Sequence, residues 1–202
     1  MTFHSMSRRR YLALSAMGCG CAVPGARVAM AAEIAEAPPG YTLPSAPIPR
    51  GKAPGMQARL LDGAPGGPRS YALIFGKGDE VMSGLIDWAE REKIVAAHLT
   101  AIGAFRSVLF GWFDQSHRAY RHIPVDQQVE CISLVGDIGL ANDKPAVHVH
   151  GSVAFPDGTV RGGHLIHGTV WPTMEVFVST SEHALDKERD PETTLWLFDL
   201  QH

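Results

Sequence analysis

The sequence predicts an α+β fold with a largely antiparallel, multi-stranded sheet and one main helix. Residues 80–93 carry apolar side chains at helical spacing, whereas most of the chain after them divides into short segments typical of strands. Short turns join these segments, and such connections favour antiparallel neighbours. One early helix followed by many strands is typical of the α+β class.

Two strands and the helix open the ordered part of the chain. Residues 56–61 and 70–75 are expected to form strands around a turn rich in Gly and Pro. Asp79 is a favoured N-cap residue, so the helix is expected to cover residues 80–93. Its apolar stripe consists of Val81, Met82, Leu85, Trp88 and Ala89.

Strands are expected along the rest of the chain, because apolar and β-branched residues recur there between turn residues. The expected ranges are 96–101, 107–113, 119–123, 128–135, 146–155, 159–166, 174–179 and 195–200. Cys131 lies in an apolar run and is interpreted as a buried thiol.

The N-terminus has the three regions of an export signal in the usual order. The motif Ser-Arg-Arg-Arg-Tyr-Leu at 7–12 precedes a modestly apolar run to Val23, and small residues follow it. We interpret residues 1–31 as a twin-arginine signal peptide, so the mature protein is expected to be periplasmic or otherwise extracytoplasmic. The alternatives are the basic N-terminus of a cytoplasmic protein and a lipoprotein modified at Cys19.

Composition divides the remaining chain into a linker and one domain. Residues 32–55 are rich in Pro and Gly and lack periodicity, which predicts a flexible linker before a domain at 56–202. Loss of the signal would remove four of the 18 basic residues and none of the 21 acidic ones, changing the net charge from −3 to −7. Such a charge opposes binding to the phosphates of nucleic acids.

Three histidines on one predicted hairpin are the strongest functional feature. His148 and His150 lie on an alternating strand, and Pro-Asp-Gly at 156–158 is typical of a three-residue hairpin loop with a bulge. This loop pairs Phe155 with Thr159, which sets His150 opposite His164 and His148 opposite Ile166. All three rings are then expected on one face, with Val147, Val149, Val153, Phe155 and Leu165 on the core face.

Imidazoles at cross-strand spacing can bind one transition metal, and Zn²⁺ accepts three histidines with a fourth position open. We expect zinc or another divalent transition metal at His148, His150 and His164. Water, a ligand or the carboxylate of Glu175 would occupy the remaining position. By parity His167 is expected to point to the opposite face. The alternative is that these are ordinary surface or hydrogen-bonded histidines.

Several segments, in order, resemble the plants and prokaryotes conserved (PPC) domain over residues 56–200. They are Gly-Asp-Glu-Val at 78–81, Ala-Ile-Gly-Ala-Phe at 101–105, Gly-Trp-Phe-Asp at 111–114, Ile-Pro-Val at 123–125, Val-Glu-Cys-Ile-Ser-Leu-Val-Gly-Asp-Ile at 129–138, His-Val-His at 148–150, Gly-Gly-His-Leu at 162–165 and Pro-Thr-Met-Glu-Val at 172–176. The resemblance implies an α+β homotrimer and, as in prokaryotic members, a metal held by His148, His150 and His164. Plant members carry AT-hooks, whereas this chain has no Arg-Gly-Arg-Pro hook.

Three functions remain open. The first is a trimeric, exported ligand-binding or scaffold protein with a metal site for a small anionic or carbonyl-bearing ligand. The second is a zinc-dependent enzyme of the hydrolase or lyase type that uses metal-activated water, with Glu175 as the candidate catalytic base. The third is DNA binding by family analogy, which the export signal, the acidic charge and the missing AT-hook oppose.

Overall fold

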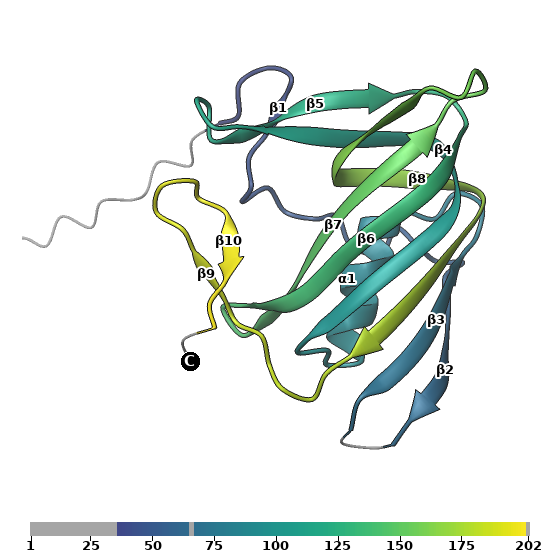
Figure 1. The fold of residues 1–202 in the computed structure, drawn as a ribbon, viewed down its shortest axis with the longest axis vertical. Coiled ribbons are helices and arrows are strands. Elements are labelled where there is room, and N and C mark those ends of the chain that lie inside the picture. The colour runs from purple at the N-terminus through teal and green to yellow at the C-terminus, as the bar shows by residue number, and fades with distance from the viewer. Residues whose placement is uncertain (1–35, 65–66, 201–202) are drawn as a thin grey trace, which may run out of the picture. The chain divides into compact units, whose positions relative to one another are not determined.

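A computed structural model describes residues 36–64 and 67–200. The predicted α+β class is confirmed: one helix packs against a large sheet in which the strand pairings are antiparallel (Figure 1). The elements are β1 (Tyr41–Thr42), β2 (Gln57–Gly63), β3 (Arg69–Phe75), α1 (Val81–Arg91), β4 (Ala97–Asp114), β5 (Ala119–Val125), β6 (Val129–Ala141), β7 (Lys144–Ala154), β8 (Val160–Thr180), β9 (Lys187–Arg189) and β10 (Trp196–Phe198).

The sheet curves so far that four of its strands close into a ring. The strand order is β1-β5-β4-β6-β7-β8-β3-β2, and β4 also pairs with β8. Strands β9 and β10 form a separate hairpin. The helix lies across the inner face of the sheet (Figure 1), where Trp88, Leu85 and Phe75 are fully buried. The same core contains Val149, Val153 and Leu165 from the histidine hairpin, as alternation predicts.

Two long strands replace four shorter predicted ones. The sequence predicts strands at 96–101 and 107–113, but β4 runs through both, with a bulge between Ala101 and Gly103. Likewise, β8 joins the predicted strands at 159–166 and 174–179. The prediction missed this continuity because bulges interrupt the two-residue period without ending the hydrogen-bonded ladder.

The helix begins one residue later than predicted, because its N-cap is Glu80 and not Asp79. The Glu80 carboxylate accepts hydrogen bonds from the amides of Met82 (3.1 Å) and Ser83 (2.6 Å). Asp79 is buried and instead accepts amide hydrogen bonds from Gly55 and Gly76, both at 2.8 Å. Asp79 therefore joins the turn after β3 and the segment before β2 at the start of the helix, a tertiary role that local propensity does not reveal.

The described part of the predicted flexible linker is packed against the domain. Strand β1 pairs with β5, and the Arg50 guanidinium binds Asp87 and Glu90 of α1. Prolines fix φ and reduce the entropy lost on ordering, so a Pro-rich segment without periodicity can still be ordered. The predicted signal peptide at 1–31 lies outside the described residues. Within residues 36–64 and 67–200, no helix is long and apolar enough to cross a membrane.

Candidate metal centre

The histidine hairpin has the predicted turn and register. The Phe155 amide donates to the Thr159 carbonyl at 2.9 Å, and Gly158 has the positive φ of 81° that the turn requires. The Asp157 carboxylate accepts a hydrogen bond from the Thr159 amide at 2.9 Å. His150 lies opposite His164, as predicted.

Beyond this pair the two strands separate. The ladder between β7 and β8 ends at His150 and His164, so the predicted pairing of His148 with Ile166 does not form. From His164 onward β8 pairs with β4, beginning opposite Gly111. As a result, β8 does not pair with β7 at His148, and the histidine site is open at this point.

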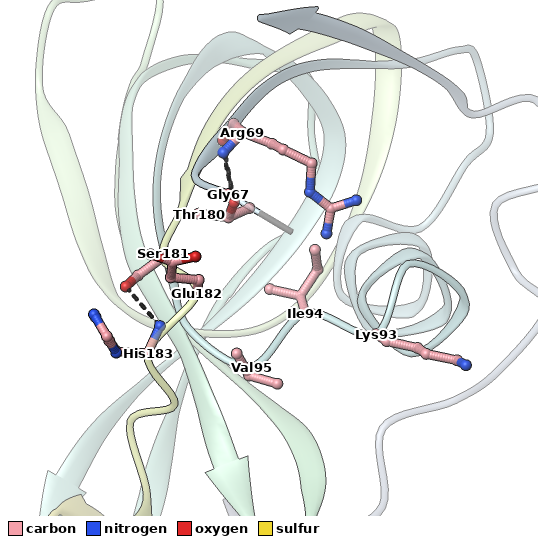
Figure 2. A pocket seen from close by; sticks show the side chains of 9 residues that line it. All are labelled: Gly67, Arg69, Lys93, Ile94, Val95, Thr180, Ser181, Glu182 and His183. Carbon is pink, nitrogen blue, oxygen red and sulfur yellow. Dashed lines mark hydrogen bonds between the residues drawn. The ribbon is translucent and has the colours of Figure 1, made fainter. Parts of the chain in front are cut away.

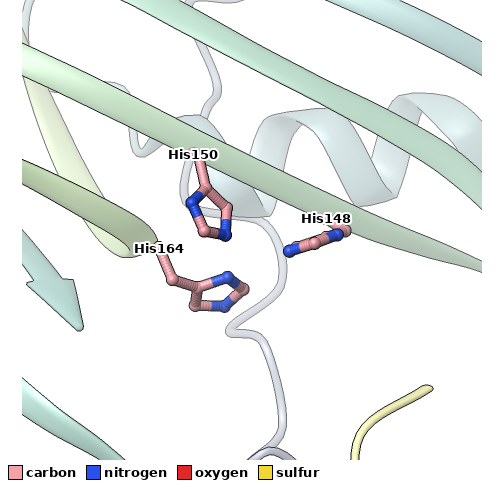
Figure 3. Close-up of side chains that lie close together, drawn as sticks. All are labelled: His148, His150 and His164. Carbon is pink, nitrogen blue, oxygen red and sulfur yellow. The ribbon is translucent and has the colours of Figure 1, made fainter. Parts of the chain in front are cut away.

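The three rings nevertheless converge (Figure 3). The ring centroid of His148 lies 5.0 Å from that of His150 and 5.2 Å from that of His164, and His150 and His164 are 5.4 Å apart. One nitrogen from each ring lies within 4.8 Å of the others. Nitrogens bound to a tetrahedral zinc at about 2.0–2.1 Å are roughly 3.3 Å apart, so small side-chain rotations would complete a site.

The environment of His164 is more typical of a metal-binding histidine than of one without a bound metal. Tyr120 of β5 stacks on its ring, with centroids 4.1 Å apart and planes 6° apart. Its Nδ1 atom is buried and has no hydrogen-bond partner. Burial, followed by the charges of His148 and His150, lowers the pKa of His164 to about 3. Burial also lowers the pKa of His150. Both rings are therefore neutral near pH 7 and free to bind a metal through a nitrogen lone pair.

Asp137 on β6 is a further site residue, which the sequence analysis missed. Its carboxylate lies 3.4 Å from Nδ1 of His148 and also binds the buried ammonium of Lys187. A carboxylate behind a ligand histidine fixes the ring and favours metal binding through its other nitrogen. The detectable signal was Asn-Asp at 142–143. Both residues have positive φ, and this two-residue turn sets Asp137 opposite His148.

The structure does not bring Glu175 to the histidines. Glu175 is exposed on the distant half of β8, where it lies opposite Ile74 on one side and Ile102 on the other. It therefore cannot be the fourth ligand, nor a base beside a metal at this site, within one chain. His167 is also outside the group of three, but the expectation that it points to the opposite, core face was wrong. A bulge follows Leu165, so His167 is exposed rather than turned toward the core.

A hollow that is separate from the histidine site lies elsewhere on the domain. Figure 2 shows its lining, which includes Arg69, Lys93, Thr180 and His183, and its volume is about 480 Å³. No group of three potential metal ligands lies there within the described residues. The histidine cluster is thus the better candidate for chemistry.

A strongly curved antiparallel sheet, one covering helix and three converging histidines define a small α+β domain with a candidate metal site. Residues 63–182 match the sequence profile of the Plants and Prokaryotes Conserved (PCC, or PPC) domain. The match covers more than half of the chain, so the chain belongs to this family. A comparison with curated proteins gives no significant match.

Solved structures of similar proteins agree with this assignment. The plant- and prokaryote-conserved protein of Pyrococcus horikoshii is 25% identical, with a TM-score of 0.62 over 72% of this chain and 97% of that one. The metal-containing protein AF0104 of Archaeoglobus fulgidus is 31% identical, with a TM-score of 0.60 over 70% and 96% of the two chains. A Ralstonia eutropha protein with a provisional DNA-binding label is 29% identical, with a TM-score of 0.61 over 64% and 90%.

Proposed function

We propose that this PPC-domain protein is an exported, homotrimeric zinc protein that binds a small ligand or serves as a scaffold. The observation that carries the proposal is the convergence of His148, His150 and His164 around one point. The buried, partnerless Nδ1 of His164 supports a metal there, because buried polar atoms normally have a partner.

Zinc fits the donor set, since it binds neutral imidazoles and accepts three of them with one position open. The metal-containing relative from Archaeoglobus fulgidus adds support from a protein of similar fold. A bound metal would supply a Lewis acid. The chain itself would orient it through the Asp137–His148 pair and shield it with the Tyr120 ring.

The metal proposal is tested by elemental analysis of the protein purified after native export, with a chelator-treated sample as the control. The expected result is close to one zinc per chain before chelation and none after it. A protein that contains no transition metal, and takes up none when zinc is supplied to the chelated sample, would contradict the proposal.

An exposed apolar surface supports self-association. Phe177 and Val135 flank Thr100 on neighbouring strands, and both are more than half exposed, at 53% and 56%. Ile102, 60% exposed, and Ile74 lie on the same face, on either side of Glu175. Contiguous exposed apolar residues usually mark an interface.

Light scattering of the mature protein at micromolar concentration should give three times the monomer mass. Phe177→Asp should shift this mass toward the monomer, because it places a charge in the apolar surface. The matched control Leu60→Asp, at an exposed residue of β2, should leave the mass unchanged. A clean monomer for the unmodified protein would refute the trimer.

Export is proposed from the twin-arginine motif at 7–12 and the small residues that precede position 32. Changing Arg8 and Arg9 to Lys should leave precursor in the cytoplasm. An unchanged periplasmic yield would reject the twin-arginine route.

A further inference from the structure

A cavity of about 620 Å³ opens beside the histidines, and its walls come from both ends of the domain. His148, His164 and Tyr120 line one part of it. Leu43 and its neighbours up to Arg50 form one wall, and residues 195–197 form another. The lining is largely apolar, and a cavity of this size suits a small organic molecule.

Both walls lie outside the residues that match the family. The match covers residues 63–182, whereas the walls are formed by residues 42–50 and by 187 and 195–197. The terminal segments therefore wall the cavity from outside the region that matches the family.

The N-terminal wall is held at both of its ends. At one end Thr42 is paired with β5, and its hydroxyl lies 2.8 Å from Nε2 of His122. At the other end Arg50 binds Asp87 and Glu90, and the Gly51 amide donates to Asp87 at 2.8 Å. Between these anchors, prolines at 44, 47 and 49 stiffen the segment. The wall is thus an ordered part of the cavity.

The C-terminal wall is joined to the histidine site through Lys187. The Lys187 side chain is buried, bonds to Asp137 and lies 4.6 Å from the ring centroid of Phe198 on β10. The β9–β10 hairpin is thereby tied to the carboxylate that orients His148. Because Asp137 neutralises Lys187, this ammonium does not supply a free charge to a ligand.

We infer that this cavity binds monocarboxylic acids with an apolar body, the carboxylate on the metal and the body between the two terminal walls. This inference rests on the proposed metal. The cation at the histidines would supply the positive charge, and carboxylate oxygen is an accepted zinc ligand. The apolar lining that includes Leu43, Ile48 and Leu197 would favour an extended or aromatic body over acetate.

The test uses the full mature protein loaded with Co²⁺, whose visible absorption reports on ligands at the metal. Acetate, butanoate, hexanoate and octanoate are titrated in turn. Affinity should rise roughly fourfold for each added CH₂ that is buried, so octanoate should bind at least about 100-fold more tightly than acetate. Octylamine should not change the spectrum. The chelated protein, followed by calorimetry, should bind octanoate far more weakly.

Variants place the chain-length effect in the walls. Leu43→Asp and Leu197→Asp should each weaken octanoate binding at least tenfold, and by a larger factor than acetate binding, while leaving the cobalt spectrum of the ligand-free protein unchanged. Leu60→Asp, outside the cavity, should behave as the unmodified protein. Equal affinities for acetate and octanoate, or no binding of either, would overturn the inference with the metal proposal intact. Failure to bind any metal would overturn both.

Discussion

The two ends of strand β8 meet very different surroundings. Near its start, His164 is covered by Tyr120 and faces the two histidines of β7. Near its end, Glu175 is exposed between Ile74 and Ile102 on neighbouring strands. The first end lies where β7 and β8 separate and a concave site forms, whereas the second lies inside a continuous ladder that presents an apolar outer surface. One strand thus carries a candidate binding site and a candidate assembly surface.

Removing one of the three histidines at the metal-site end should have the largest effect on zinc affinity. His164→Ala, His148→Ala or His150→Ala should weaken zinc binding by roughly 100-fold or more, because structural zinc sites in small domains bind with about 10–16 kcal/mol shared among only a few ligands. Glu175→Gln and His167→Ala should leave it unchanged. Competition with a chromophoric chelator measures all five. Metal loss in Glu175→Gln would abolish the distinction between the two ends.

Acid should destabilise the metal-free protein through the His164 end. The folded-state pKa of His164 is about 3, below the unfolded value of about 6.5. The unfolded chain therefore binds the proton first as pH falls, so stability is complete above about pH 6.5 and declines toward pH 3. Over this pH range the free energy of unfolding, measured with urea, should decrease by about 3 kcal/mol when partial solvation of the ring is taken into account.

The control for this pH dependence is His164→Phe, which keeps a ring against Tyr120 but does not titrate. Its stability should decline less over the same range. If the two proteins lose stability in parallel, other groups dominate the acid response. The affinity for zinc should also decrease as the pH is lowered, because protons compete for the imidazole nitrogens.

Asp137→Asn should have a smaller effect on the same end. It removes the carboxylate behind His148, and such changes typically lower metal affinity by about 10–100-fold. The variant also leaves the buried Lys187 without its charged partner. Lys187→Met separates the two effects, because it keeps Asp137 beside His148. If Lys187→Met lowers zinc affinity as much as Asp137→Asn does, the carboxylate does not act through His148.

The smallest effect is expected between the two ends, where the helix cap is joined to β8. The Glu80 carboxylate accepts from the Gly168 amide at 2.9 Å as well as from the first turn of α1. Glu80→Ala should lower stability by about 1–2 kcal/mol without changing zinc affinity. Thermal unfolding and chelator competition test this. A loss of zinc affinity would show that α1 also positions the histidines.

The histidine end was predictable because its geometry is local. A Pro-Asp-Gly loop fixes the register between two adjacent strands, and register fixes which side chains share a face. The position of Glu175 could not be predicted locally, because it depends on which strands pair with the C-terminal half of β8. Sequence periodicity carries no information about that pairing. The same limit explains Asp79, whose partners Gly55 and Gly76 come from other segments.

The sequence by itself determined the α+β class, the helix, the hairpin turn and the convergence of His148, His150 and His164. These features depend on periodicity and turn chemistry over a few residues. Only the tertiary structure decided that Tyr120 covers His164 and that Lys187 binds the Asp137 carboxylate. It also decided that residues 42–50 wall a cavity rather than form a flexible linker. Those contacts join segments far apart in the chain, and curvature of the sheet, not local propensity, brings them together.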